Sequence, residues 1–259
     1  GIFTKLRLRV QPRPPARAVV LAAFADLEDT VRALDDLFGA GILPATAELL
    51  DRSAVEALRV WQPDLGLPDG EAILFIEVEG TRDHVASEAR DVEALVRRRA
   101  TVTSLAEDEE AIRRLWASRS GLAAAAALAH PGKHRIFAGE DLAVPLSEIP
   151  RTIRRARELG SEAGIAVIFY GHFGDGNVHT AILIDPSDDD EVRRADLLAH
   201  RLHELAVEVG GTVTGEHGTG AVRQPYMRAE HGDALDAMRR LKAAFDPEGI
   251  LNPGKIYGA

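Results

Sequence analysis

The chain has 259 residues, of which 46% are hydrophobic and 28% are charged, a composition typical of a folded globular protein. Its formal net charge of −10 argues against nucleic acid as a partner, because phosphate binding needs a basic surface, and no window is apolar enough to cross a membrane. Cysteine is absent, which excludes disulfides, thiolate metal sites and thiol nucleophiles, so a metal would have to be held by histidine and carboxylate.

The first fifteen residues differ from those that follow. Residues 3–10 alternate between apolar and polar side chains, which predicts a strand, and Pro12, Pro14 and Pro15 end it as a linker. A strand at the end of a chain usually pairs with something before it. We therefore expect residues 1–15 to be the last strand and linker of an upstream domain, and residues 16–259 to form a domain of their own.

The remaining elements are predicted from the spacing of apolar residues, which repeats every two residues in strands and every 3.6 residues in helices. Asp26, for example, is a suitable N-cap for the helix that follows it. Strands are predicted over residues 17–24, 45–50, 71–79, 142–144, 165–170 and 178–184. Helices are predicted over residues 27–39, 54–61, 83–99, 108–128, 146–159, 188–209 and 231–245. This order predicts an α+β fold, a largely antiparallel sheet covered by helices in a ferredoxin-like duplicated arrangement with a helical C-terminal tail.

The hairpin of residues 171–179 (GHFGDGNVH) carries two histidines. If residues 174–177 form the turn, His172 lies opposite His179, and opposed residues have Cβ atoms about 4.5–5.5 Å apart on one face. That separation lets two imidazoles converge on one ion. The alternative is a pair of partly exposed surface histidines around a tight turn, whose glycines serve only the backbone geometry.

A second glycine-rich segment, residues 215–220 (GEHGTG), follows residues 213–214, which are predicted to continue a strand. Glu216 could add a carboxylate oxygen to the two imidazoles, and three protein ligands leave a position open for substrate. His217 would then be free to act as a base near neutral pH. The alternative for this segment alone is a solvated turn.

A third segment, residues 250–256 (ILNPGKI), is by itself a turn that closes the chain. The three motifs in this order resemble the C-terminal domain of FAD-linked oxidases of the vanillyl-alcohol oxidase type. The nearest members are the group of D-lactate dehydrogenase, D-2-hydroxyglutarate dehydrogenase and the FAD subunit of glycolate oxidase. The resemblance covers almost the whole chain, including residues 1–13, which look like the last strand of the preceding FAD-binding domain.

The resemblance implies a role for each motif residue. In metal-dependent members the positions of His172, His179 and Glu216 bind a divalent ion, usually described as zinc, and the position of His217 contacts substrate as a base. These residues would support metal-assisted proton abstraction from a 2-hydroxy acid, with hydride transfer to FAD.

Two further residues resemble family positions that contact substrate and flavin. Arg119 resembles the arginine that pairs with the substrate carboxylate, a task suited to a bidentate guanidinium, although a helix-surface arginine is the alternative. Asn252 resembles a residue close to the flavin. The FAD pocket of the family lies mostly in the upstream domain, so this chain alone is predicted to be inactive and to bind FAD poorly.

The chain departs from the hydroxyglutarate enzymes at the positions that would hold a second substrate carboxylate. It has Ala123 one helical turn after the arginine, Gly139-Glu140 in place of a lysine, and Ala181 in place of an asparagine. A small monocarboxylate such as D-lactate or glycolate therefore fits better as the substrate.

Two rival functions stay open, and the sequence also predicts partners, an oligomeric state and a location. A two-histidine-one-carboxylate iron oxygenase would use the same ligand set, and a degenerate regulatory or assembly domain of this fold would bind no metal. We expect an electron-accepting iron–sulfur partner subunit, no nucleic acid partner, and a homodimer as one oligomeric state. The expected location is the cytoplasm, with a peripheral position at the inner face of the membrane as the alternative.

Overall fold

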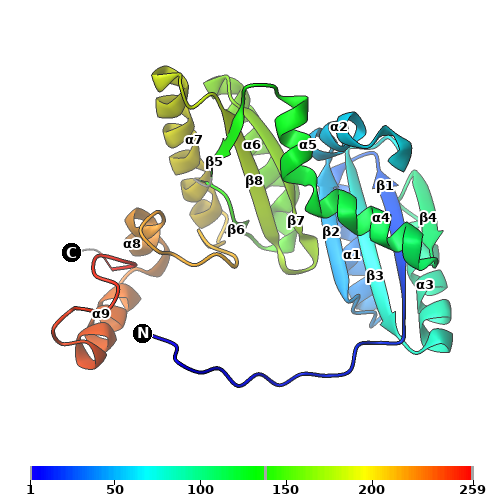
Figure 1. Cartoon of the computed structure of the whole chain (residues 1–259), viewed down its shortest axis with the longest axis horizontal. Coiled ribbons are helices and arrows are strands. Elements are labelled where there is room, and N and C mark those ends of the chain that lie inside the picture. The colour runs from blue at the N-terminus through cyan, green and yellow to red at the C-terminus, as the bar shows by residue number, and fades with distance from the viewer. Residues whose placement is uncertain (1, 137–138, 258–259) are drawn as a thin grey trace.

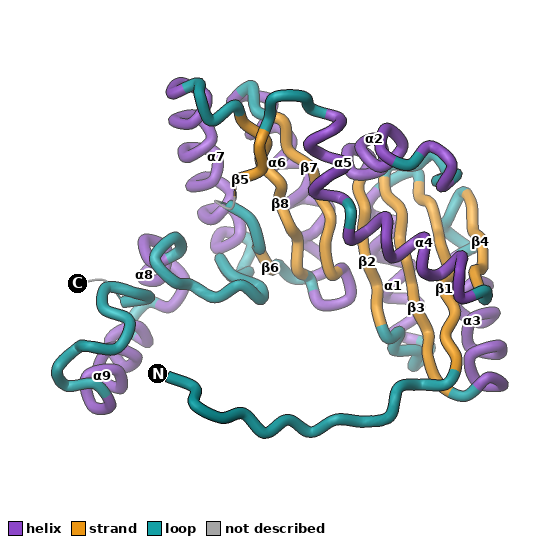
Figure 2. The backbone as a smooth tube through the Cα atoms, viewed as in Figure 1, coloured by secondary structure: helices purple, strands orange, loops and turns teal. Residues whose placement is uncertain are grey.

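The computed structural model describes residues 2–136 and 139–257 (Figures 1 and 2). Gly1 and residues 137–138 and 258–259 lie outside the described residues, so the outer limits of the two predicted domains, residues 1 and 259, do too. Within the described chain, no helix is both long and apolar enough to span a membrane.

The first half of the described chain forms a ferredoxin-like unit, as predicted. Its strands pair antiparallel in the order β4-β1-β3-β2, and a helix follows β1 and another follows β3. The elements are β1 (Ala16–Phe24), α1 (Leu27–Gly39), β2 (Thr46–Asp51), α2 (Arg52–Trp61), β3 (Ala72–Gly80), α3 (Arg82–Val96) and β4 (Val102–Ala106).

The second half repeats this plan in part and extends the same sheet. Antiparallel pairing of β2 with β7 joins the halves, which gives the order β4-β1-β3-β2-β7-β8-β5, with β6 also paired to β8. The elements are α4 (Glu109–Ser120), α5 (Leu122–Ala129), β5 (His134–Ile136), β6 (Leu142–Ala143), α6 (Ile149–Ala163), β7 (Ala166–His172), β8 (Asn177–Ile184) and α7 (Asp189–Glu208). The 3-10 helices are η1 (Pro63–Leu65), η2 (Leu146–Glu148), η3 (Phe173–Asp175) and η4 (Gln224–Tyr226).

Helices cover both faces of the sheet, which makes two apolar cores (Figure 2). The helices α1, α3, α6 and α7 pack on one face, and α2, α4 and α5 pack on the other. Because both faces are covered, the central strands β1 and β3 are buried along nearly their whole length. The sequence pattern of α1 produces its packing directly: Asp26 accepts the backbone N–H of Asp29 at 2.7 Å, and Val31, Leu34 and Leu37 are buried.

The predicted helix over residues 108–128 is wrong, because it is broken into α4 and α5 at Gly121. The backbone N–H of Gly121 closes the end of α4 on Ala117 O at 2.9 Å. The indole of Trp61 fills the space beside the break, where a Cβ on residue 121 would lie 2.1 Å from the ring. Apolar periodicity does not show this break, since alanines continue on both sides of it. The short strands β4 and β5 were not predicted either.

Two further strand predictions, for residues 3–10 and 213–214, are also wrong for the described residues. Residues 2–15 form no strand; they run as an exposed, extended segment away from β1 (Figure 1), because a strand needs a hydrogen-bonding partner beside it. Their assignment to an upstream domain stays a prediction. Residues 213–214 do not continue a strand, and one isolated bridge joins Thr212 to Ala143. The predicted helical tail is confirmed as α8 (Met227–His231) and α9 (Ala234–Phe245), which stand apart from the sheet (Figure 1).

The register of the β7–β8 hairpin differs from the predicted one by two residues. Tyr170, not His172, lies opposite His179, because the turn begins at Phe173 as a 3-10 helix and ends at Gly176 with φ +82. A shift of two residues keeps every side chain on its face of the sheet. His172 and His179 therefore still share a face, as diagonal neighbours.

We predict that Gly176→Ala destabilises the protein by about 2–4 kcal/mol, through the left-handed backbone and overpacking. A Cβ at this position would lie 2.2 Å from the carbonyl oxygen of Val144. Urea unfolding of the purified variant measures the change. Gly174→Ala in the same turn is the matched control, since its Cβ would meet only the Cβ of Ala47 at an ordinary 3.5 Å. Equal losses in both variants would contradict the explanation.

Candidate metal and substrate site

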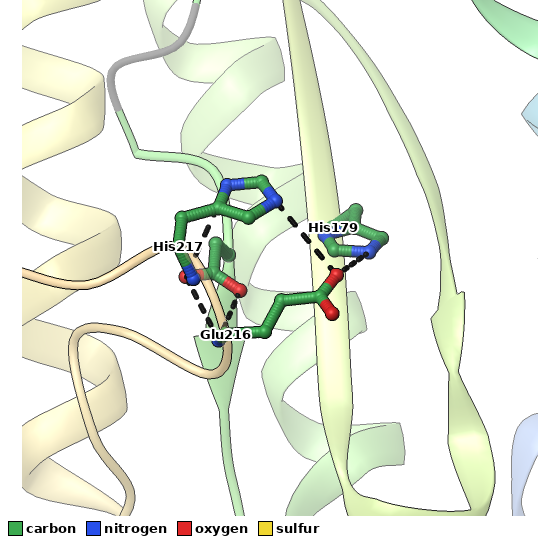
Figure 3. Close-up of side chains that lie close together, drawn as sticks. His179, Glu216 and His217 are labelled. Carbon is green, nitrogen blue, oxygen red and sulfur yellow. Dashed lines mark hydrogen bonds and ion pairs between the residues drawn. The ribbon is translucent and has the colours of Figure 1, made fainter. Parts of the chain in front are cut away.

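The predicted ligands lie on the sheet face that is covered by α2, α4 and α5. Tyr170 of β7 and Ala181 of β8 belong to the apolar core on that face, so His172 and His179, which alternate with the same period, point the same way. The loop after α7 brings Glu216 beside His172 and His179. Figure 3 shows Glu216 with His179 and His217.

Three imidazoles converge on one carboxylate oxygen. Oε1 of Glu216 lies 3.2 Å from Nε2 of His172, 3.5 Å from Nε2 of His179 and 3.7 Å from Nε2 of His217. The rings are also neighbours, with centroids 5.2 Å apart for His172 and His179 and 5.6 Å apart for His179 and His217. The structure thus brings together all three predicted ligands and the predicted base.

A compact group of potential metal ligands does not contain the same residues as the three predicted ligands. Ligand atoms of Asp141, His179, Glu216 and His217 all lie within 4.8 Å of one another. His172 is outside this set but contacts Glu216 directly. Asp141 was not foreseen from the sequence.

Asp141 anchors the loop that carries Glu216 and His217. Its fully buried carboxylate accepts the backbone N–H groups of both residues at 2.9 Å, the Asn177 amide at 2.9 Å and the Thr214 hydroxyl at 2.9 Å. Burial alone would raise the pKa of Asp141, but the hydrogen bonds from His217, Asn177, Glu216 and Thr214 outweigh it and hold that pKa below its usual value. With its oxygens occupied in this way, Asp141 is better suited to fixing the loop than to binding an ion.

The pKa values of the two strand histidines are shifted in opposite directions. Burial lowers the pKa of His179 to about 3, with His172 and Arg119 adding to the effect, so its imidazole is neutral and able to donate a lone pair. Its Nδ1 has no hydrogen-bond partner among the described residues. Burial would also lower the pKa of His172, but the hydrogen bond that its Nδ1 donates to Glu48 and the charges of Glu48 and Glu216 outweigh burial and raise that pKa.

Arg119 of α4 points into the site rather than lying on the helix surface. Its Nε donates to Glu48 Oε2 at 2.7 Å, and its Cζ lies 4.7 Å from the centroid of the Tyr170 ring. The side chain is 15% exposed. Glu48, which also contacts Nδ1 of His172, was likewise not foreseen.

Asn252 lies apart from the histidine cluster but shares a groove with it. A groove of about 540 Å³ is lined by His217, Gly218, Asn252 and Tyr257, among others. The hydrogen bond from Ile256 N to Gly220 O, 2.7 Å long, ties the C-terminal segment to the loop that carries His217. The third motif therefore forms the far wall of a groove that begins at His217.

The chain is similar to known flavin enzymes over nearly its whole length. Residues 13–256 match the family described as FAD linked oxidases, C-terminal domain. Glycolate oxidase subunit GlcD of Bacillus subtilis (strain 168) is 34% identical over 99% of this chain and 54% of its own length. The mitochondrial D-lactate dehydrogenase (cytochrome) of Arabidopsis thaliana is 30% identical over 99% of this chain and 45% of its own length. The chain thus spans about half the length of these curated relatives.

Solved structures agree on the fold. The 4-ethylphenol oxidase from Gulosibacter chungangensis superimposes with a TM-score of 0.71 at 17% identity, covering 96% of this chain and 55% of that one. The p-cresol methylhydroxylase with substrate bound gives a TM-score of 0.71 at 17% identity, covering 95% of this chain and 53% of that one. At this identity the likeness concerns the fold alone.

We predict that Asp141→Asn lowers the free energy of unfolding by about 1–3 kcal/mol, because buried donors of the 214–217 loop lose their acceptors. Asparagine tolerates the positive φ of 74 at this position, so the backbone itself is not strained. Asp175→Asn is the control, since exposed Asp175 accepts one bond of 3.2 Å, and it should cost about 0.5 kcal/mol or less.

The same comparison has a defined pH dependence. A carboxyl group whose pKa is lowered by folding stabilises the protein above its unfolded value, here 3.8, and loses that contribution as the pH falls through the folded value. The stability difference between wild type and Asp141→Asn should therefore be steady well above pH 3.8 and shrink below it. A difference that grew on acidification would contradict the role of the charged carboxylate.

Proposed function

Because the chain belongs to the family of FAD-linked oxidase C-terminal domains, as its three motifs predicted, we propose that it forms the substrate side of a flavin-dependent dehydrogenase or oxidase. The substrate would be a small 2-hydroxy acid of the D-lactate or glycolate kind. One observation carries this proposal: the carboxylate oxygen of Glu216 lies 3.2–3.7 Å from three imidazole nitrogens.

His172, His179 and Glu216 are the residues that would hold a divalent cation, with zinc suited to their nitrogen and oxygen donors. The fit is supported by the neutral, buried imidazole of His179, whose Nε2 lies 3.5 Å from Oε1 of Glu216. When bound, such an ion would polarise the substrate hydroxyl and lower its pKa. Gathering these groups at one point costs the fold stability, because the buried Nδ1 of His179 has no hydrogen-bond partner among the described residues.

His217 is the residue we assign as the base. Its ring is 39% exposed, and its nearest carboxylate oxygens, on Glu216, Glu140 and Asp141, lie 3.7–4.0 Å away. The ring therefore has room to approach a substrate hydroxyl and accept its proton at Nε2 or Nδ1. Its backbone is held by Asp141, which fixes where that proton can be taken.

Arg119 would bind the substrate carboxylate. Among the described residues only its Nε donates a hydrogen bond, to Glu48, which leaves the two terminal nitrogens for a bidentate contact. Arg119 lies over Tyr170 and shares Glu48 with His172, which puts a carboxylate held there within reach of the histidine cluster. The monocarboxylate preference rests on the alanines at positions 123 and 181.

FAD would be held mainly by an upstream domain, to which residues 1–15 would belong, and when bound it accepts the hydride. Asn252 and the groove that it shares with His217 would face the flavin. By analogy with a relative named as a glycolate oxidase subunit, an electron-accepting partner subunit is part of the proposal. A cytoplasmic location and a homodimer complete it.

The metal is tested by elemental analysis of the purified protein. We predict about one equivalent of a divalent metal in the wild type, as expected for one site, and its loss in His172→Ala. His200→Ala is the control, because exposed His200 on α7 bonds only Tyr226 and Glu204 among the described residues. A metal-free wild type would instead favour the degenerate regulatory domain, and iron with oxygen consumption in the absence of flavin would favour the oxygenase.

The base is tested in the flavin-loaded enzyme. His217→Ala should lower kcat for D-lactate or glycolate by about 10²–10⁴-fold, the usual contribution of a general base, while the metal content is retained. His84→Ala, which removes an exposed histidine whose one ion pair within the described part of the chain is with Glu88, should leave kcat unchanged. Loss of the metal from His217→Ala would make His217 a ligand and overturn its assignment as the base.

A further inference from the structure

We propose that Glu48 of β2 is a positioning residue that fixes both His172 and Arg119, so that one buried carboxylate aligns the metal ligand with the group that binds substrate. The inference rests on the proposed function, because it assigns Glu48 a role in that same site. The observation behind it is that the two oxygens of Glu48 contact these two side chains separately: Oε1 contacts Nδ1 of His172, and Oε2 accepts from Nε of Arg119 at 2.7 Å.

Strand pairing sets the contact with His172. Glu48 and His172 are direct partners across the β2–β7 pair, the one that joins the two halves of the sheet. Their side chains therefore stand next to each other on the same face, and the contact does not depend on a flexible loop. Glu48 is 2% exposed, so water does not compete for its oxygens.

The contact determines which nitrogen of His172 can bind an ion. A carboxylate only accepts hydrogen bonds, so Nδ1 of His172 must carry the hydrogen and donate it to Glu48. When the ring carries one proton, Nδ1 keeps it, because the Glu48 carboxylate is buried whereas that of Glu216, 3.2 Å from Nε2, is half exposed. The lone pair is then on Nε2, the nitrogen that faces Glu216. Carboxylates behind metal-binding histidines act in this way in many proteins.

The second contact orients the arginine. With Nε bound to Glu48 and Cζ 4.7 Å from the Tyr170 ring centroid, the plane of the Arg119 guanidinium is held at two points. Its terminal nitrogens are then presented in one direction. Glu48 thus sets the distance between the group that would bind the substrate carboxylate and the imidazole that would bind the ion.

Glu77 provides a matched comparison on the neighbouring strand. It is also buried, lies on the same face in β3, and bonds a side chain of α4, Trp116 Nε1, with Arg17 3.6 Å away. It differs from Glu48 in touching neither His172 nor Arg119. If the protein only needed a buried carboxylate under α4 for its structure, replacing either glutamate should affect the site equally.

The test compares Glu48→Gln with Glu77→Gln in the purified protein, stripped of metal and titrated with Co²⁺. Glu48→Gln should weaken Co²⁺ binding by about 10- to 100-fold, the usual effect of losing a carboxylate behind a ligand, and should change the visible spectrum of the bound ion. In the flavin-loaded enzyme the same variant should raise KM for the 2-hydroxy acid. Glu77→Gln should leave the Co²⁺ affinity, the spectrum and KM at wild-type values.

Two measurements separate positioning from general destabilisation. Added to His172→Ala, Glu48→Gln should cause no further loss of Co²⁺ affinity, because its effect passes through that imidazole. Nitrogen-15 NMR of the metal-free protein, at a pH where His172 carries one proton, should find that proton on Nδ1 in the wild type and distributed over both nitrogens in Glu48→Gln.

The outcomes against the inference are distinct from those against the proposed function. Equal Co²⁺ affinity and an unchanged His172 tautomer in Glu48→Gln would overturn the positioning role and leave the proposed function intact. Equal losses in Glu77→Gln would also overturn it. A wild type that binds no Co²⁺ would overturn the metal site of the proposed function and, with it, this inference.

Discussion

The hydrogen bonds that the Asp141 carboxylate accepts are the constraint on which the rest of the site depends. The two strand histidines are placed by the sheet, but Glu216 and His217 belong to a loop with no strand or helix of its own. Asp141 holds that loop through its backbone N–H groups and holds the β8 hairpin through Asn177. Gly215 permits the close approach, since a Cβ there would lie 1.9 Å from the Asn177 amide nitrogen.

The duplicated sheet explains why a site forms at this point. Each half ends in a strand that would otherwise be an exposed edge, and the pairing of β2 with β7 buries both edges at once. Polar residues of one half then face polar residues of the other, as Glu48 faces His172. The α4 helix crosses the same face and adds Arg119 to the junction. The chemistry thus lies between the repeats, where neither half alone would complete it.

Much of the fold could be predicted because its signals are local. The helix α1 was predicted to the residue, since its cap and its apolar spacing lie within one segment. The alternation of side chains along a strand correctly predicted that His172 and His179 share a face, although the predicted β7–β8 register was off by two residues. Glu48 and Asp141 could not be found in this way. Each contacts partners 75 or more residues away, as with Glu216 and His172, and a buried carboxylate leaves no periodic pattern in its own neighbourhood.

The strand residues and the loop residues of the site differ in how firmly they are held against thermal motion, because the loop follows α7 and lies outside the sheet. His172 and His179 share the stability of the central sheet, whereas Glu216 and His217 are tied down mainly through one side chain. Local opening of that loop would cost far less than global unfolding and would remove half of the cluster while the sheet stays intact. If the cluster holds a cation as proposed, the opening rate of this loop would limit its release, so its exchange would be slower than diffusion and faster than unfolding of the domain.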